Sequence, residues 1–204
     1  MDRRHFLIGL PLALSACTGQ EVWAPDDLVA RAIYRDPGPK HITLYTMKNI
    51  GSDNGAHTSL AINASQRVLF DPAGSFEQSQ MPERNDVLFG VTPRLESYYV
   101  SFHARVTYYV TGQTVEVSPE VAEQALELAL VAGPVPKANC ARVTSRLLRA
   151  LPGFEGFRQT WSPNRIEEDF AMLPGVETQE FRENDADDKS IAAARIKAAL
   201  TAQQ

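Results

Sequence analysis

Two stretches of alternating apolar and polar residues, separated by a glycine-rich turn, limit the choice of fold. Residues 41–47 alternate isoleucine and leucine with threonine and tyrosine, and residues 56–62 form a second such stretch after the turn at 51–55. A period of two residues is typical of β-strands with one buried face, and a short turn rich in glycine and asparagine predicts a hairpin. We therefore expect an antiparallel sheet, to which residues 68–71 add a third strand.

The second half of the chain is predicted to be mainly helical. Ser118-Pro119 and Ser162-Pro163 each place a hydroxyl that can cap free amides before a proline, whose missing N–H costs nothing at a helix start. A further helix is expected to begin at Cys140, with Asn139 as its cap, and to continue to Leu151 before a proline-glycine stop.

The other expected elements complete a mixed pattern without an internal repeat. They are a helix at 26–34, a polar loop at 72–86, a helix at 93–102, β segments at 105–110 and 114–117, a strand at 176–181 and a helix after Asp188. This order predicts the α+β class, with an antiparallel sheet packed against helices. A chain of 204 residues is long enough for one domain with a substantial core.

The N-terminus is predicted to be an export signal that ends in a lipidation site. Arg3-Arg4 precede an apolar run from Phe6 to Leu14, which is too short to cross a bilayer. Leu14-Ser15-Ala16-Cys17 resembles the cleavage site of bacterial lipoproteins, at which the cysteine becomes lipidated. Residues 2–7 resemble a twin-arginine export motif, although an ordinary signal peptide is the alternative. Thr18 favours, by resemblance to sorted lipoproteins, the outer membrane facing the periplasm.

These signals divide the chain into four expected parts. They are a signal peptide at 1–16, a lipidated tether with a short helix at 17–40, a folded domain at 41–182, and an acidic and then alanine-rich tail at 183–204. The lipid anchor would be the means of membrane attachment, because no later apolar run approaches membrane length.

Charge and residue spacing argue against several kinds of partner. The net charge of −5 gives no indication of the basic face that nucleic-acid binding requires. Asp185, Asp187 and Asp188 lack the glycine and distal glutamate of a calcium loop, and Cys140 has no closely spaced residues that would complete a zinc site. The sequence therefore predicts neither a metal nor a cofactor.

Cys140 is the principal candidate for chemistry. With Cys17 assigned to lipidation, Cys140 has no partner for an intramolecular disulfide in an oxidising compartment. The first turn of a helix stabilises a thiolate through its free amides and partial positive charge, and the same amides can hold an oxyanion. The alternative is a small hydrophobic residue that begins a buried helix face.

A reactive thiol needs a base, and three histidines lie outside the signal. His41 begins a strand, and His103 ends a helix, where the helix dipole favours histidine. His57 starts a strand on which its same-face neighbours Ser59 and Ala61 are small, so that a helix could approach and bring a thiol to the ring. His57 is therefore the candidate base, and the alternative is a strand-end histidine that bonds to backbone.

The arrangement resembles a known family. Residues 55–62, followed by a short turn and Val68-Leu69-Phe70-Asp71, are similar to the histidine hairpin of papain-like NlpC-type peptidases. The later Asn139-Cys140 pair at a helix start resembles the circularly permuted branch, in which histidine precedes cysteine. That branch includes lecithin retinol acyltransferase-like proteins and bacterial envelope hydrolases. The resemblance covers residues 41–151, although residues 134–138 lack the aromatic that relatives often have there.

The resemblance implies a cysteine hydrolase or acyltransferase that works through a thioester. It makes Cys140 the nucleophile, His57 the general base and Asp71 the residue that orients the base, with Asn139 as oxyanion support or helix cap. Asp71 precedes Pro72, so a plain turn residue is the alternative. The substrate would be a peptide, another amide or a lipid acyl group of the envelope, such as a peptidoglycan peptide. The alternative function is a non-catalytic lipoprotein that binds a peptide or protein partner.

Overall fold

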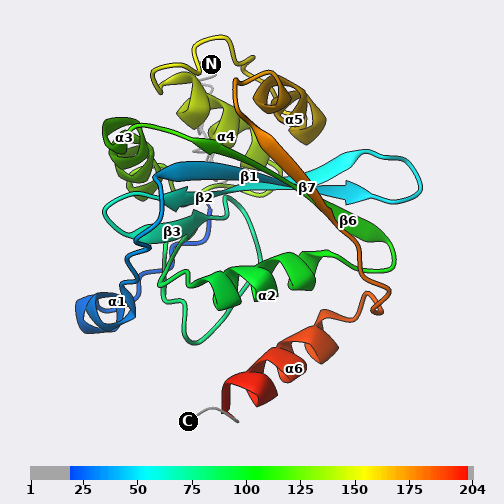
Figure 1. Ribbon diagram of the computed structural model, residues 1–204. Coiled ribbons are helices and arrows are strands. Elements are labelled where there is room, and N and C mark those ends of the chain that lie inside the picture. The colour runs from blue at the N-terminus through cyan, green and yellow to red at the C-terminus, as the bar shows by residue number, and fades with distance from the viewer. Residues whose placement is uncertain (1–18, 202–204) are drawn as a thin grey trace, which may run out of the picture.

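A computed structural model describes residues 19–201, and within them seven strands form one antiparallel sheet (Figure 1). The strand order across the sheet is β4-β5-β3-β2-β1-β6-β7. The strands are β1 (His41–Asn49), β2 (Gly55–Asn63), β3 (Arg67–Phe70), β4 (Glu83–Arg84), β5 (Val87–Phe89), β6 (Tyr108–Glu116) and β7 (Glu177–Phe181). The α+β class and the antiparallel sheet are confirmed.

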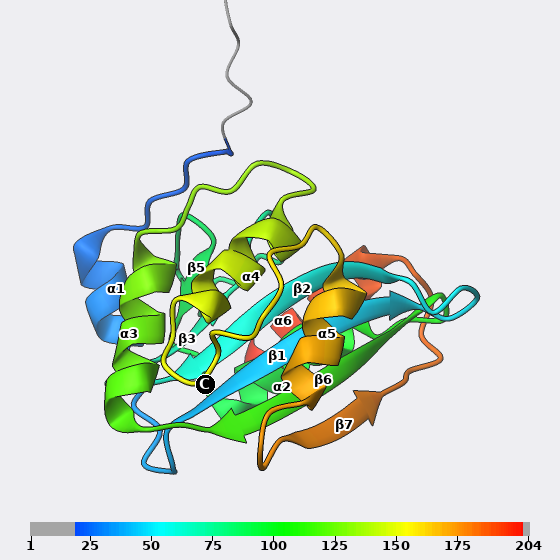
Figure 2. The ribbon, with the colours of Figure 1, turned by 90° about the horizontal axis from the view of Figure 1, so that it is seen from above.

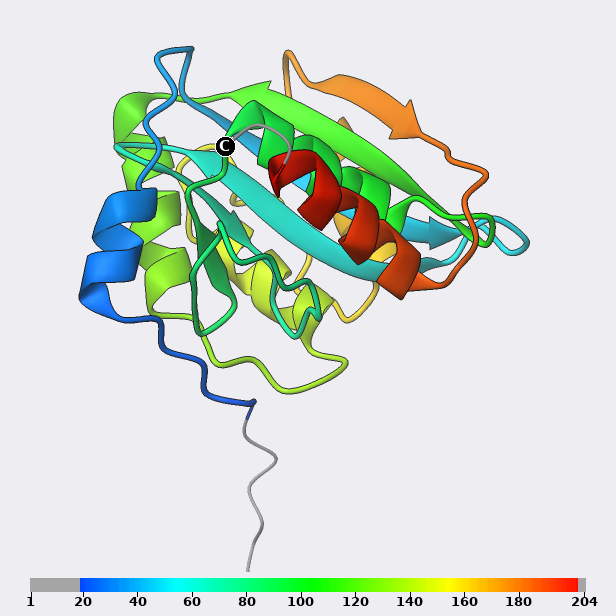
Figure 3. The same cartoon turned by 90° about the horizontal axis from the view of Figure 1, so that it is seen from below.

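Helices cover both faces of the sheet. They are α1 (Asp26–Ala32), α2 (Pro93–His103), α3 (Pro119–Leu130), α4 (Cys140–Arg149), α5 (Pro163–Ala171) and α6 (Lys189–Thr201). Figure 2 shows α3, α4 and α5 on one face, and Figure 3 shows α2 and α6 on the other. No helix in the part of the chain from 19 to 201 is long and apolar enough to span a membrane.

Strand alternation divides the core into two layers. Leu44 and Leu60 belong to the buried cluster under α3, α4 and α5, whereas Tyr45 and Ala61 belong to the cluster under α2. Leu44 pairs directly with Leu60 in the β1–β2 register, and Tyr45 lies diagonally across from Ala61. Because neighbouring residues on a strand point to opposite faces, the predicted alternation supplies both layers.

The two β segments predicted at 105–110 and 114–117 are instead one strand, β6. Gly112 lies between the two predicted segments, and it pairs with Tyr45 of β1 and Gln179 of β7. A Cβ at this position would lie 3.1 Å from the Tyr45 ring and 3.2 Å from the Phe181 ring. The glycine therefore admits two aromatic rings on a continuous strand and does not mark a turn.

The segment predicted as a polar loop at 72–86 contains a small hairpin. Asn85 and Asp86 join β4 to β5 with φ values of 45° and 69°. Two consecutive positive φ values are typical of the tight turn that links two antiparallel strands, and asparagine and aspartate tolerate them well. β4 and β5 thereby extend the sheet beyond β3.

Two of the three predicted helix caps are wrong. Ser118 accepts the N–H of Val121 at 3.3 Å and caps α3 as expected. Ser162 and Asn139 occupy the N-cap positions of α5 and α4, but neither side chain bonds to the helix amides. Asn139 has φ −103° and ψ 5°, outside the extended region that directs a cap side chain to these amides.

Both ends of the described chain pack on the domain. The segment expected as a tether pairs with the sheet edge, where Ala24 donates to the Glu83 carbonyl and Asn85 donates to the Val22 carbonyl. At Gly19 a Cβ would lie 2.6 Å from the Pro134 carbonyl carbon, so only glycine fits this close backbone approach. The expected C-terminal tail forms α6, which contacts α2 and buries Ala192 and Ile196 (Figure 3).

Candidate active site

The three predicted catalytic residues lie together at one end of β2. His57 is near the start of β2, Asp71 follows β3, and Cys140 is the first residue of α4. The Nε2 atom of His57 is 2.6 Å from Oδ1 of Asp71, and a hydrogen bond joins the imidazole to the Cys140 thiol. With Nε2 held by the carboxylate, Nδ1 is the ring nitrogen left for the thiol.

Unequal strand lengths create the space for this cluster. β3 pairs with β2 from Leu60 to Asn63, so the first residues of β2 extend beyond the end of β3. Asp71 is the first residue after β3 and is buried on the same face as His57. The start of β2 is held by α5, where Asn164 accepts the Gly55 N–H at 2.5 Å and donates to the Asp53 carbonyl.

The route by which the thiol reaches the imidazole differs from the expectation. The small same-face neighbours of His57 were expected to admit the Cys140 helix. In the structure that face is covered by α2, and α4 packs on the opposite face with Leu60 and Ile62. Cys140 therefore reaches His57 at the sheet edge left open beyond β3, where it also bonds to the Thr58 backbone.

Tyr99 of α2 supports the carboxylate and was not predicted. Its hydroxyl lies 2.7 Å from Oδ1 of Asp71 and 2.8 Å from Oγ of Ser59. A phenol has one proton, and the charged carboxylate is the stronger acceptor, so Ser59 donates to Tyr99 and Tyr99 donates to Asp71. The small Ser59 thus has a polar role in addition to the space it leaves.

The charges of the cluster favour an ion pair between thiol and imidazole. Burial opposes a charged His57, but the charge and hydrogen bond of Asp71, with a contribution from Cys140, raise the pKa of His57 to about 10. Burial likewise opposes a Cys140 thiolate, but His57 and backbone bonds from Thr58 and Ala141 hold the pKa of the thiol below its usual value of 9.0. Both shifts favour a thiolate beside an imidazolium over the neutral thiol and imidazole.

His103 lies against the site and was predicted only as a helix end. Its ring stacks with that of His57 at 6.1 Å between centroids, and its Nδ1 donates to the Tyr99 carbonyl at 2.8 Å. Burial lowers the pKa of His103 to about 4, and the imidazolium of His57 lowers it too, against the opposing charge of Asp71. His103 is therefore a neutral ring that packs against the His57 imidazole.

Acid should destabilise the fold through His103. Its pKa is about 4 when folded and 6.5 when exposed, so the unfolded chain takes up this proton first as the pH falls. We expect this histidine to cost about 2 kcal/mol of unfolding free energy between pH 7 and pH 5. The His103→Gln protein should therefore lose about 2 kcal/mol less unfolding free energy than the wild type between pH 7 and pH 5. Urea unfolding of both proteins at the two pH values measures the difference, and equal losses would contradict the assignment.

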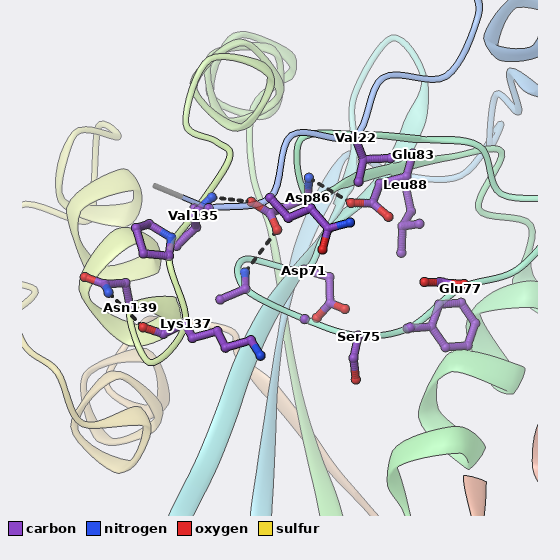
Figure 4. A pocket seen from close by; sticks show the side chains of 16 residues that line it. Val22, Asp71, Ser75, Glu77, Glu83, Asp86, Leu88, Val135, Lys137 and Asn139 are labelled. Carbon is purple, nitrogen blue, oxygen red and sulfur yellow. Dashed lines mark hydrogen bonds between the residues drawn. The ribbon is translucent and has the colours of Figure 1, made fainter. Parts of the chain in front are cut away.

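Two pockets flank the cluster. One of about 610 Å³ lies between the β4–β5 hairpin, the loop after Asp71 and the segment that leads into α4, where Lys137 and Asn139 line it (Figure 4). The other, of about 350 Å³, opens on the His57 side and is also lined by His103. Cys140 lines neither pocket and is 7% exposed.

The first turn of α4 can accept a negative charge. Asn139 donates to the Lys137 carbonyl and accepts from Arg142, so its side chain does not cap this helix. Uncapped amides and the helix dipole favour an oxyanion beside the thiol. Asn139 turns its side chain to its own loop, away from the amides that it was expected to bond.

Comparison with known proteins gives no relative from which a role could be transferred. No family model, no curated protein and no solved structure matches this chain. The interpretation of the site therefore depends on the geometry of its own residues.

Proposed function

We propose that this protein is a cysteine-dependent hydrolase or acyltransferase with a circularly permuted, NlpC-type papain-like fold. One observation carries the proposal. A thiol at a helix N-terminus bonds to an imidazole whose other nitrogen is held by a buried carboxylate. This is the arrangement that activates a cysteine nucleophile, and its members come from three separate elements of the fold.

The proposed reaction transfers an acyl group through a thioester. The Cys140 sulfur attacks the substrate carbonyl carbon, and the resulting oxyanion is stabilised by the first-turn amides of α4. When the carbonyl re-forms, the bond to the leaving group breaks and the His57 imidazolium donates its proton to that group. Neutral His57 then takes a proton from water or another acceptor, which attacks the thioester and releases the thiolate.

We also propose that the protein acts as an envelope lipoprotein. Support comes from the Leu14-Ser15-Ala16-Cys17 sequence and the preceding signal, which lie outside the described residues. Lipid on Cys17 would anchor the protein to a membrane, with the periplasmic face of an outer membrane as the favoured place. Substrates within reach would then be envelope amides, among them peptidoglycan peptides, or lipid acyl groups.

A specific observation favours a second candidate function. Cys140 is buried and outside both pockets, as expected for a protein that binds a peptide or protein partner without chemistry. In that case the ion pair would be a structural contact, and the larger pocket would be the binding site.

Thiol reactivity distinguishes the two functions. We expect Cys140 in the folded protein to react with iodoacetamide at pH 7 at least about tenfold faster than free cysteine, because its thiolate persists to lower pH. The tryptic peptide that contains Cys140 reports the rate by mass spectrometry without interference from Cys17. Labelling that becomes fast only in urea would support the binding protein. Digestion of muropeptides and phospholipids by the wild type and Cys140→Ala would then separate the substrates.

A further inference from the structure

The pocket on the His57 side is lined by two cations, Arg105 and Lys189, together with the site histidines His57 and His103. Arg105 follows α2, and Lys189 begins α6. Neither cation was singled out by sequence, because the two are far apart along the chain and meet only when α6 packs on α2. A volume of about 350 Å³ is at the small end of the range for ligand pockets.

Arg105 has an unused donor. Its side chain is 4% exposed, its Nε donates to the Phe102 carbonyl, and one terminal nitrogen pairs with Asp185 at 3.3 Å. The other terminal nitrogen is buried and has no hydrogen-bond partner. An unpartnered donor on a buried guanidinium is costly, and because Arg105 lines the pocket its positive charge favours an anion there.

Lys189 also lacks a carboxylate partner within the part of the chain that the structure describes. Its ammonium lies 4.6 Å from the centroid of the Phe102 ring, and the residue is exposed at the start of α6. Burial and the charge of Arg105 lower the pKa of Lys189, against the attraction of Asp71. The cation is therefore held close to another cation, which an anion between the two would relieve.

The carboxylates near this pocket are already engaged. Asp185 is shared between Arg105 and Arg195, with Arg195 at 2.7 Å. Asp187 accepts the Thr107 hydroxyl at 2.7 Å and its backbone N–H at 3.4 Å. The Asp71 carboxylate is bonded to Nε2 of the His57 imidazole and does not line this pocket. Among the residues that line the pocket, Arg105 and Lys189 are cations and Asp187 is the one carboxylate, so positive charge is left over.

We propose that this pocket binds a carboxylate on the amine side of the scissile bond. This inference rests on the proposed function, because it is His57 that would protonate the leaving amine, and the pocket opens at His57. The substrate class is then an amide or peptide whose released amine carries a carboxylate close by, in the manner of an acidic or C-terminal amino-acid residue. A phospholipid acyl ester lacks such a group next to its leaving alcohol.

Binding of small carboxylates tests this inference without catalysis. In Cys140→Ala protein, calorimetric titration should show N-acetyl-glutamate binding about tenfold or more tightly than its neutral diamide, N-acetyl-glutaminamide. Lys189→Met should weaken binding of the acid about tenfold, and Lys189→Arg should retain it. Arg146→Met is the control, because Arg146 is an exposed cation on α4 outside this pocket.

Equal binding of the acid and the amide, no saturable binding of the acid, or a Lys189→Met protein that binds like its parent would overturn the inference. These outcomes are separate from a failure of the proposed function. The thiol is absent from the protein used here, whereas slow alkylation of Cys140 is measured in the wild type and leaves the pocket intact.

Discussion

Replacement of His57 with alanine is expected to slow alkylation of Cys140 at pH 7 about a hundredfold. Without the imidazolium, the main contribution that offsets burial of a charged thiolate is lost, so the pKa of the thiol rises toward its ordinary value of 9.0. A thiol of that pKa is about 1% thiolate at pH 7, and the thiolate is the form that reacts. The rate should be measured with iodoacetamide from pH 5 to pH 10, with the midpoint of the profile moving upward.

His41→Ala is the matched control for this change. His41 is the first residue of β1, whereas His57 pairs with Met47 near the other end of that strand. The His41 ring bonds to the Pro39 carbonyl. Its removal should leave the labelling rate of Cys140 unchanged. If the His57→Ala protein were folded by circular dichroism and still labelled at the wild-type rate, the ion pair would not exist.

Asp71→Asn is expected to slow the same reaction by about tenfold to a hundredfold at pH 7. The amide keeps the shape of the carboxylate and its place beside Tyr99, but it removes the charge that holds His57 protonated. Burial would then lower the pKa of His57, leaving a neutral ring that stabilises a thiolate less well. The labelling profile should again shift to higher pH, by less than with His57→Ala.

Asp86→Asn separates this electrostatic effect from a general loss of stability. Asp86 is a partly buried carboxylate in the same region, and its oxygens accept the backbone N–H groups of Ala73 and Val135. Both variants lose one carboxylate charge near the site, but only Asp71 contacts the imidazole. Equal labelling rates in the two variants would mean that Asp71 does not act through His57.

The sequence was sufficient to predict much of the sheet and less of its edges. β1 and β2 were predicted from residues that alternate along the strand, and β3 from an apolar run that follows a short turn. β5 escaped prediction because a strand of three residues, Val87–Phe89, is too short to display a period. The interruption predicted between residues 110 and 114 is absent, because Gly112 continues β6 and lies against two aromatic rings from other strands.

The candidate site divides in the same way. His57 and Cys140 were identifiable because His57 lies near the start of β2 and Cys140 begins α4, and local signals indicate where elements begin. Tyr99 and His103 are four residues apart on α2, a spacing that places them on one helix face, but nothing local shows that this face covers β2. Arg105 and Lys189 could not be joined from sequence, because their proximity depends on where α6 packs.

The close approach of Gly19 to the backbone at Pro134 has a consequence for reach. Gly19 lines the same pocket as Asn139, at the entrance to the cysteine helix. With a lipid on Cys17, as proposed, two residues of at most about 7 Å would connect the acyl chains to the pocket rim. Such an enzyme could not extend across the periplasm; it would work within a layer next to the bilayer, on molecules that come to that surface.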